Sequence, residues 1–316
     1  MSSKRVVFKG TAPGKAILFG EHAVVHGRPA IAVPVSQVRA VAQVRLSPDG
    51  SQRVVSKNTG LDLRLADAPP GFWGSALVAA LEEAIGDPLG PFLLEIDSTI
   101  PVAAGLGSGA AIAVAAARAL AACADFETDD ETINRVAFEV EKIHHGTPSG
   151  IDNTTVTTAR PVYYRRGGPV ETFQPAVPLH IVIGLTGSAS PTGRVVADVR
   201  AARERDPARY DRIFDEIGRI VDQSRRSIET GDLDRLGRLM DENHDWLCEM
   251  TVSSPELDRL VASARSAGAR GAKLSGGGRG GNMIALVAPD TAAAVAAALA
   301  AAGAVRTIRT EVTTRE

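Results

Sequence analysis

The feature that most constrains the fold is a glycine-rich turn at residues 101–111, which reads PVAAGLGSGAA. The glycines that alternate from Gly105 free the backbone from side-chain crowding, so that amide N–H groups can converge on an anion. Small and apolar residues with helical periodicity follow from Ser108 to about Ala122, and a helix N-terminus adds unpaired N–H groups and a positive dipole end. The turn is either a phosphate cradle or a tight connection that needs glycine for steric reasons. It is not a Walker A loop, because no Gly-Lys-Ser/Thr follows.

A second unusual segment is the polar stretch IHHGTPSGIDNTT at residues 143–155. It follows a predicted helix over residues 129–145 whose last turns carry Glu141, and Asp152 lies beyond that helix on a predicted turn. Two carboxylates near a phosphate cradle suit Mg²⁺ binding and general-base catalysis. The alternatives are an Asx-turn for Asp152 and a solvated helix face for Glu141.

Two further segments are rich in glycine. Residues 11–27, TAPGKAILFGEHAVVHG, place Lys15 after a proline–glycine turn, which is either a functional motif or a hairpin with a solvated lysine. Residues 273–286, KLSGGGRGGNMIAL, hold five glycines in the six positions 276–281. A mobile loop of that kind is one interpretation, but strand-like flanks favour a loop that is fixed at both ends.

The remaining pattern alternates strands and helices and predicts an α+β protein with two domains, residues 1–176 and 177–316. A proline-flanked join near Gln174 marks the boundary. The predicted strands of the first part are 5–12, 29–35, 38–46 and 91–100, and its helices are 74–86, 108–122 and 129–145. The second part reads as a buried strand from 179, helices at 207–229, 232–249 and 254–268, a strand–turn–strand unit at 271–289, a last helix and a last strand.

Composition excludes several classes of function. The formal net charge is −2 and aromatic residues make up 4% of the chain, so neither a basic field nor a stacking platform for nucleic acid is expected. The chain shows neither a signal-peptide pattern nor an apolar run long enough to span a bilayer, which predicts a cytoplasmic protein. Cys123 and Cys248 read as reduced thiols rather than a disulfide or a zinc site. His22, His26 and His144 lack convincing metal-ligand spacing, as does His145.

The order of these segments is more specific than any of them alone. The chain carries APGKAILFGEHAVVHG, then PVAAGLGSGAA, then HGTPSGIDN, then GAKLSGGGRGG, over residues 12 to 281. This arrangement resembles the mevalonate kinases, within the superfamily of galactokinases, homoserine kinases, mevalonate kinases and phosphomevalonate kinases (GHMP kinases). The resemblance implies an N-terminal domain with a left-handed βαβ unit, a ferredoxin-like C-terminal domain, and transfer of the ATP γ-phosphoryl group to the C5 hydroxyl of mevalonate in isoprenoid biosynthesis.

The resemblance also implies a role for individual residues. Lys15 matches the active-site lysine, Asp152 the proposed base, and Glu141 a Mg²⁺ ligand, with Ser108 as a second candidate ligand. The phosphate loop that would bind ATP comprises Pro101, Ala104, Gly105, Leu106, Gly107, Ser108, Gly109 and Ala110. Positions expected near the substrate are Glu21, His22, His145, Ser149, Thr192 and Gly277.

One position departs from the family pattern. The phosphate loop often carries a second serine that ligates Mg²⁺, and here that position is Gly109; the metal would then rely on Glu141, the phosphates and water. Asn282 replaces a residue that is usually small, and no role is assigned to it. The alternatives to a mevalonate kinase are another GHMP kinase for a small alcohol, the ATP-dependent decarboxylase that shares the fold, and a non-catalytic nucleotide-binding protein. The oligomeric state is open, with a homodimer as one expectation.

Overall fold

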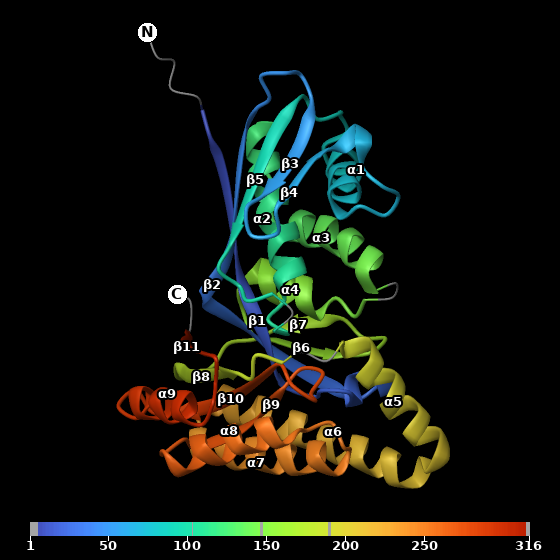
Figure 1. Cartoon of the computed structure of the whole chain (residues 1–316). Helices are drawn as coiled ribbons and strands as arrows, with labels where there is room; N and C mark the ends of the chain where they lie inside the picture. Colours follow the sequence, from blue (N-terminus) through green and yellow to red (C-terminus); the bar gives the residue numbers. More distant parts are fainter. Residues whose placement is uncertain (1–5, 103, 146–147, 189–190, 314–316) are drawn as a thin grey trace. The chain divides into compact units, whose positions relative to one another are not determined.

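The computed structural model describes residues 6–102, 104–145, 148–188 and 191–313, and these divide into two compact units. We call them unit 1 and unit 2 (Figure 1) and treat each separately. Unit 1 comprises residues 1–14, 38–101 and 107–159, and unit 2 comprises residues 15–37, 102–106 and 160–316. The predicted boundary between residues 176 and 177 stays a prediction.

Unit 1 contains a small sheet with strands in the order β4-β3-β5-β2. Strands β3 and β5 run parallel and the other pairs run antiparallel, so the chain between β3 and β5 makes a crossover that includes β4 and α1. The hand of this crossover stays a prediction. The elements are β1 (Phe8–Phe19), β2 (Pro29–Leu46), β3 (Gln52–Ser56), β4 (Leu61–Arg64), η2 (Leu65–Asp67), α1 (Trp73–Ile85), β5 (Phe92–Ser98), α2 (Ser108–Cys123), α3 (Asp130–His145) and α4 (Ile151–Thr158), with β1 and β2 continuing into unit 2. The two strands predicted at 29–35 and 38–46 are one strand, β2.

Helix α2 forms the core of unit 1, and its run of alanines has a packing reason. A Cβ atom added at Gly10 on β1 would lie 2.1 Å from the carbonyl oxygen of Ala115 on α2. Strand and helix backbones therefore approach closely, which only small side chains permit. Arg118 on the same helix donates to the carbonyl oxygens of Thr11 and Thr157, 2.9 and 2.8 Å away, and so joins β1, α2 and α4.

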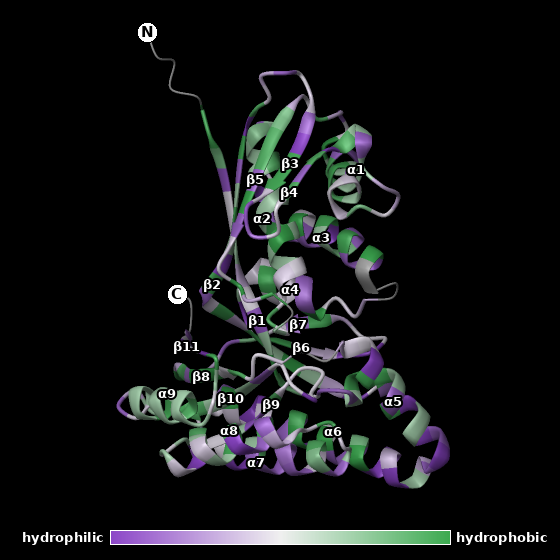
Figure 2. Cartoon of the chain, viewed as in Figure 1, coloured by the Kyte–Doolittle hydropathy of each residue, from purple (hydrophilic) through white to green (hydrophobic). Residues whose placement is uncertain are grey.

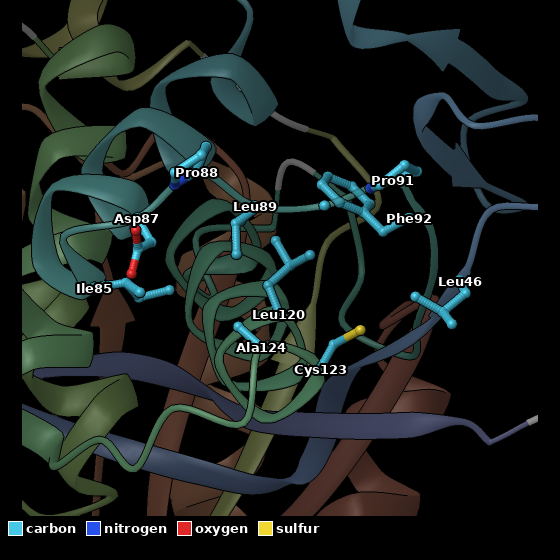
Figure 3. A pocket seen from close by; sticks show the side chains of 11 residues that line it. Leu46, Ile85, Asp87, Pro88, Leu89, Pro91, Phe92, Leu120, Cys123 and Ala124 are labelled. Carbon is cyan, nitrogen blue, oxygen red and sulfur yellow. The ribbon is translucent and has the colours of Figure 1, made fainter.

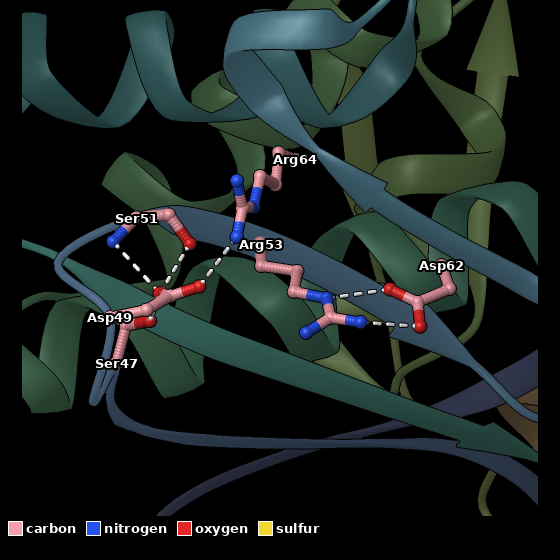
Figure 4. Close-up of polar contacts among 6 residues, drawn as sticks. All are labelled: Ser47, Asp49, Ser51, Arg53, Asp62 and Arg64. Carbon is pink, nitrogen blue, oxygen red and sulfur yellow. Dashed lines mark hydrogen bonds and ion pairs between the residues drawn. The ribbon is translucent and has the colours of Figure 1, made fainter.

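The turn between β2 and β3 is the one that its sequence, SPDGSQ, predicts. The carboxylate of Asp49 accepts hydrogen bonds from the backbone and hydroxyl of Ser51 and from Arg64, and Arg53 donates two hydrogen bonds to Asp62 (Figure 4). The two serine hydroxyls beside Asp49 hold the pKa of its carboxyl well below the usual range. These groups are exposed, so the contacts order the turn but add little stability.

Unit 2 contains a four-stranded antiparallel sheet in the order β11-β8-β10-β9. This order, with helices between the first and second strands and between the third and fourth, is that of a ferredoxin-like fold and confirms the predicted α+β class. The elements are η1 (Ala23–His26), β6 (Val162–Arg165), β7 (Val170–Thr172), β8 (Leu179–Leu185), α5 (Thr192–Arg205), α6 (Pro207–Thr230), α7 (Leu233–Glu249), α8 (Pro255–Ser266), β9 (Gly271–Ser275), β10 (Asn282–Val287), α9 (Ala292–Ala301) and β11 (Arg306–Val312). Helix α5 is not predicted by the sequence.

The long helices of unit 2 follow from their sequence patterns. Helices α6 and α7 mix hydrophobic and hydrophilic residues along their length and bury one face (Figure 2). Asp206, Asp232 and Ser254 cap α6, α7 and α8 by accepting a backbone hydrogen bond. No helix in the described part of the chain is long and apolar enough to cross a membrane.

Candidate active site

The glycine-rich turn of residues 101–111 leads directly into α2. Gly105 and Gly107 adopt φ values of 74° and 71°, in the left-handed region that favours glycine. The first hydrogen bond of the helix joins the N–H of Ala111 to the carbonyl of Gly107, at 3.0 Å. The N–H groups of the preceding helical residues consequently have no partner within the helix. The geometry is the one that an anion cradle requires.

Glu141 on α3 lies beside this helix start. Its residue is 4% exposed, so the alternative of a solvated helix face is wrong. A Cβ atom at Gly109 would lie 3.7 Å from its Oε1 atom, which is ordinary van der Waals contact. A buried carboxylate next to the positive end of a helix dipole is stabilised in its charged form, and carboxylate oxygen is a ligand that Mg²⁺ prefers.

The polar segment around Asp152 is a helix, α4, and not the predicted turn. Gly150 supplies the left-handed residue (φ 83°) before it. Asn153 donates to Asn134 Oδ1 on α3 at 2.7 Å, and Asn134 donates to the hydroxyl of Thr154 at 3.1 Å. Tertiary packing therefore stabilises a helix that local propensity disfavours, because Asn and Thr are weak helix formers.

This helix presents Asp152 in its first turn, half-buried, where a negative charge is favoured by the helix dipole. Ser149, just before the helix, is exposed, and its hydroxyl accepts a hydrogen bond from the Ile151 N–H at 3.3 Å. The side chain of His145, predicted near the substrate, lies outside the described residues. Within unit 1 the structure thus places Glu141, on α3, beside the start of α2, and it places Asp152 on the neighbouring α4.

In unit 2, the segment that carries Lys15 is tied to the phosphate loop. Lys15 lies on β1 and is 7% exposed, so it is not the solvated lysine of a hairpin. Its backbone N–H donates to the carbonyl of Leu106 at 3.0 Å. Asn282, at the start of β10, donates from Nδ2 to the carbonyl of Ala104 at 2.6 Å, and a Cβ atom at Gly105 would lie 3.2 Å from the same nitrogen.

The Gly20-Glu21-His22 turn is a tightly packed turn with a buried charge. Gly20 has φ 95°, and a Cβ atom there would lie 2.5 Å from the Cα atom of Ala30. Glu21 forms an ion pair with Lys273 on β9, 252 residues along the chain, and both side chains are almost completely buried. Burial raises the pKa of Glu21 and lowers the pKa of Lys273, and the attraction between the two charges opposes both shifts.

His22 is held in a strained conformation next to this pair. Its φ of 59° is unusual for a residue with a side chain. Its Nε2 atom lies 3.0 Å from the carbonyl of Gly277, so Nε2 carries the proton that it donates. Burial lowers the pKa of His22 to about 4, and the hydrogen bond to Gly277 opposes that shift. The imidazole is therefore neutral at pH 7.

The third glycine-rich loop is closely packed rather than a mobile surface loop. A Cβ atom at Gly277 would lie 2.9 Å from the hydroxyl of Thr192, and one at Gly278 would lie 2.0 Å from the carbonyl of Val252. Glycine is needed here because neighbouring groups occupy the space of a side chain. Thr192, the first residue of α5, is exposed. The structure thus brings together His22, Gly277 and Thr192, three of the predicted substrate positions.

Two residues of this region were missed by the sequence analysis. Lys273 was part of a motif but had no role, and Asn282 was given none. Nothing in the local sequence identifies the partners of these residues, because Glu21 and Ala104 lie more than 150 residues away. A lysine in the middle of a buried strand was the available signal for Lys273, since an unpaired charge is too costly to bury.

A cavity of about 240 Å³ lies in unit 1 at the other end of α2, and none of the predicted site residues lines it (Figure 3). Its walls come from the C-terminal ends of α1 and α2 and from the loop that enters β5. The lining residues are Leu46, Ile85, Asp87, Pro88, Leu89, Gly90, Pro91, Phe92, Leu120, Cys123 and Ala124. The cavity is therefore separate from the helix start that could hold an anion.

Comparisons with known proteins agree with the fold and with the motifs. Residues 73–160 match the family described as GHMP kinases N terminal domain, and residues 224–305 match GHMP kinases C terminal. The chain therefore belongs to the GHMP kinases. The mevalonate kinase of Pyrococcus abyssi is 37% identical over 299 residues, which cover 87% of each chain, and that of Thermococcus sibiricus is 37% identical over 312 residues, covering 93% of this chain and 92% of the relative.

Comparison with solved structures also indicates similarity to mevalonate kinases. The crystal structure of L. major mevalonate kinase in complex with R-mevalonate is 32% identical, with a TM-score of 0.83 over 99% of this chain and 98% of that one. The mevalonate kinase of Methanococcus jannaschii has a TM-score of 0.84 at 23% identity, covers both chains completely, and supports the fold. Among the GHMP kinases, this chain is a member of the mevalonate kinase family.

Proposed function

We propose that the protein transfers the γ-phosphoryl group of ATP to the C5 hydroxyl of mevalonate and forms 5-phosphomevalonate. The observation that carries the proposal is the buried Glu141 carboxylate beside the glycine-rich start of α2. Relatives with 37% identity are named mevalonate kinases, and one similar protein was solved with R-mevalonate bound. Phosphoryl transfer depends mainly on positioning and on charge neutralisation, which is what these groups would supply.

The phosphate loop would bind ATP mostly through its backbone. At Gly105, Gly107 and Gly109 no side chain blocks access to the backbone N–H groups of this loop. The α2 dipole also attracts the negative phosphates. Pro101, Ala104 and Leu106 would shape this loop, and the hydrogen bond from Asn282 to Ala104 would hold it.

Glu141 and the hydroxyl of Ser108 would hold Mg²⁺, since both offer an oxygen ligand. Ser108 is the first residue of α2, and Glu141 lies beside this helix start. The ion would neutralise phosphate charge during transfer. Gly109 leaves space beside Glu141 that water can fill, which fits the several waters that Mg²⁺ commonly keeps.

Asp152 would accept the proton of the substrate hydroxyl, and the Lys15 ammonium would favour the alkoxide-like oxygen that remains. His22, Ser149, Thr192 and Gly277 would contact the substrate. Glu21 would act through Lys273, because their mutual burial fixes the turn that presents His22. The role of His145 stays a prediction, as do a homodimer and a cytoplasmic location.

The decisive experiment is incubation of the purified protein with ATP, Mg²⁺ and R-mevalonate, with the products identified by mass. We expect ADP and a product heavier by one phosphoryl group. A panel of phosphomevalonate, homoserine and galactose tests the other kinases of the superfamily. Release of CO₂ would instead indicate the decarboxylase, and nucleotide binding without ADP formation on any substrate would indicate a non-catalytic protein.

A further inference from the structure

Outside the candidate active site, unit 2 brings three metal-ligating side chains together at the junction of α7 and α8. His244 and Cys248 lie four positions apart on α7 and therefore share one face of the helix. Asp258 lies in the first turn of α8. Their ligand atoms all lie within 4.8 Å of one another. Cys248 and Asp258 are exposed, whereas His244 is buried, so the group is open to solvent on one side.

The distances within this group match the edges of a metal coordination tetrahedron. His244 Nε2 lies 3.6 Å from Cys248 Sγ and 3.4 Å from Asp258 Oδ1, and Cys248 Sγ lies 3.7 Å from the same carboxylate oxygen. Tetrahedral Zn²⁺ with ordinary bond lengths places nitrogen, sulfur and oxygen ligands about 3.3 to 3.7 Å apart. The three distances are therefore those expected for three ligands of one tetrahedral ion.

The same geometry argues against a nucleophilic role for Cys248. In a relay of nucleophile, base and orienting acid, the thiol and the carboxylate bond to different nitrogens of the histidine. Here both approach Nε2, and Nδ1 accepts a hydrogen bond from the Leu274 N–H at 3.3 Å.

We infer that His244, Cys248 and Asp258 form a binding site for Zn²⁺, with water as the fourth ligand. A thiolate, an imidazole and one carboxylate favour a borderline-soft ion over Mg²⁺, and the two negative ligands balance its charge. On binding, the Cys248 thiol releases its proton to solvent, and the ring proton of His244 moves from Nε2 to Nδ1. The Leu274 N–H then loses its acceptor, which links the ion to strand β9. The sequence analysis predicted no zinc site at Cys248, because Asp258 belongs to another helix.

The test uses Co²⁺ as a spectroscopic probe on tag-free protein, followed by displacement with Zn²⁺. We expect one equivalent of Co²⁺ to give visible bands of tetrahedral Co²⁺ and a thiolate charge-transfer band in the near ultraviolet. Millimolar Mg²⁺ should leave these bands unchanged. Cys248→Ala should abolish the charge-transfer band, and both Cys248→Ala and Asp258→Asn should weaken Zn²⁺ binding at least about tenfold in calorimetry.

Cys123→Ala is the matched control, because it removes the other thiol of the chain and leaves the cluster intact. It should keep the band and the affinity of the wild type. The inference is overturned if the wild type shows no charge-transfer band at millimolar Co²⁺, or if the band survives in Cys248→Ala. The exposed position of Cys248 makes that variant suitable, whereas a His244 variant would also disturb the core.

Discussion

The predicted site residues of unit 1 and unit 2 are held in place by different kinds of contact. In unit 1, the glycine-rich start of α2, Glu141 and Asp152 belong to one stretch of about fifty residues. Hydrogen bonds from Arg118, Asn134 and Asn153 join the helices α2, α3 and α4 of this stretch. In unit 2, a buried ion pair and a strained histidine fix the residues, and the contacts join β1 and its following turn to β9 and the loop after it. Functional residues that lie close together in the sequence can be recognised from the sequence, whereas supporting contacts between residues far apart in the chain cannot.

This difference also separates two kinds of sensitivity. The site residues of unit 1 lie at helix ends, where conservative substitution is tolerated. Replacing one of these residues should therefore reduce turnover more than it reduces stability. Glu21 and Lys273 are charges removed from water, and removal of one leaves the other uncompensated. Substitution in unit 2 should therefore affect stability before it affects turnover.

The largest effect is expected for Asp152→Asn, which keeps the shape of the side chain and removes its ability to accept a proton. Because the residue lies half-buried in a first helical turn, where Asn is also tolerated, the fold should be retained. We expect kcat to fall at least about 10²-fold, the lower end of general-base effects. Steady-state kinetics with coupled detection of ADP, and the circular dichroism spectrum, measure the two outcomes.

The matched control is Glu131→Gln, which neutralises an exposed carboxylate in the first turn of α3. It should leave kcat unchanged. Turnover within about threefold of the wild type in Asp152→Asn would remove Asp152 from the role of base, given the size of general-base effects.

Next in size is the loss of the buried ion pair. Glu21→Gln leaves the Lys273 ammonium buried without a charged partner, which costs about 3–5 kcal/mol of unfolding free energy. Urea unfolding followed by Trp246 fluorescence in a Trp73→Phe background reports on unit 2, because Trp73 lies in unit 1. Adding Lys273→Met should recover most of the loss, since no charge then remains buried.

An exposed pair supplies the control. Glu139 and Lys142 on α3 form an ion pair with both side chains more than 40% exposed, so Glu139→Gln should change the stability by less than about 1 kcal/mol. If Glu21→Gln costs no more than Glu139→Gln, the buried pair does not stabilise the turn that carries His22.

The third prediction concerns pH and follows from His22. Its pKa in the folded protein is lowered from an ordinary value of 6.5 to about 4, mainly by burial. The hydrogen bond to Gly277 opposes this shift, and the charges of His26 and Arg279 contribute to it. The unfolded chain therefore binds a proton before the folded one does. His22 contributes stability that is complete above about pH 6.5 and is lost as the pH falls toward 4.

The measurement is the difference in unfolding free energy between the wild type and His22→Asn, determined from pH 7 to pH 4. We expect this difference to change by about 1.4 kcal/mol per pH unit between those two pKa values. Parallel curves for His22→Asn would mean that His22 is not buried as a neutral group.

How much the sequence predicts depends on the range of the interactions. Strongly periodic helices such as α6 and α7 are predicted within a few residues, and so are helix α8 and the strand–turn–strand unit of β9 and β10. Helix α4 is missed, because its propensity is weak and it depends on bonds to Asn134. Helix α5 is also missed, although it is rich in alanine and arginine, which favour a helix. Packing between distant segments supplies the stability that the local pattern does not show.

The candidate site divides in the same way. Lys15, Glu141 and Asp152 were identified because their segments carry a family pattern. The partners that support the site, Lys273 and Asn282, stand beside glycine-rich motifs but bond to residues far along the chain. A single sequence contains no signal that joins such positions, so the structure was needed to find them.

The smallest effect tests the departure at Gly109, where the resemblance would place a serine. A Cβ atom there meets only Glu141 Oε1, at 3.7 Å, among the described neighbours within 4 Å, so Gly109→Ser fits the first turn of α2. Serine is also the better helix former, and the stability should change by less than about 0.5 kcal/mol. The new hydroxyl would lie beside the carboxylate and offer one more oxygen. The Mg²⁺ concentration for half-maximal activity should therefore fall about fivefold, the equivalent of one hydrogen bond of about 1 kcal/mol.

Gly107→Ser is the contrasting variant. The φ of 71° at this position strains any side chain, and the substitution should lower the unfolding free energy by about 1 kcal/mol or more. An unchanged Mg²⁺ titration in Gly109→Ser would show that the space beside Glu141 does not face the ion, and would place the metal ligands elsewhere.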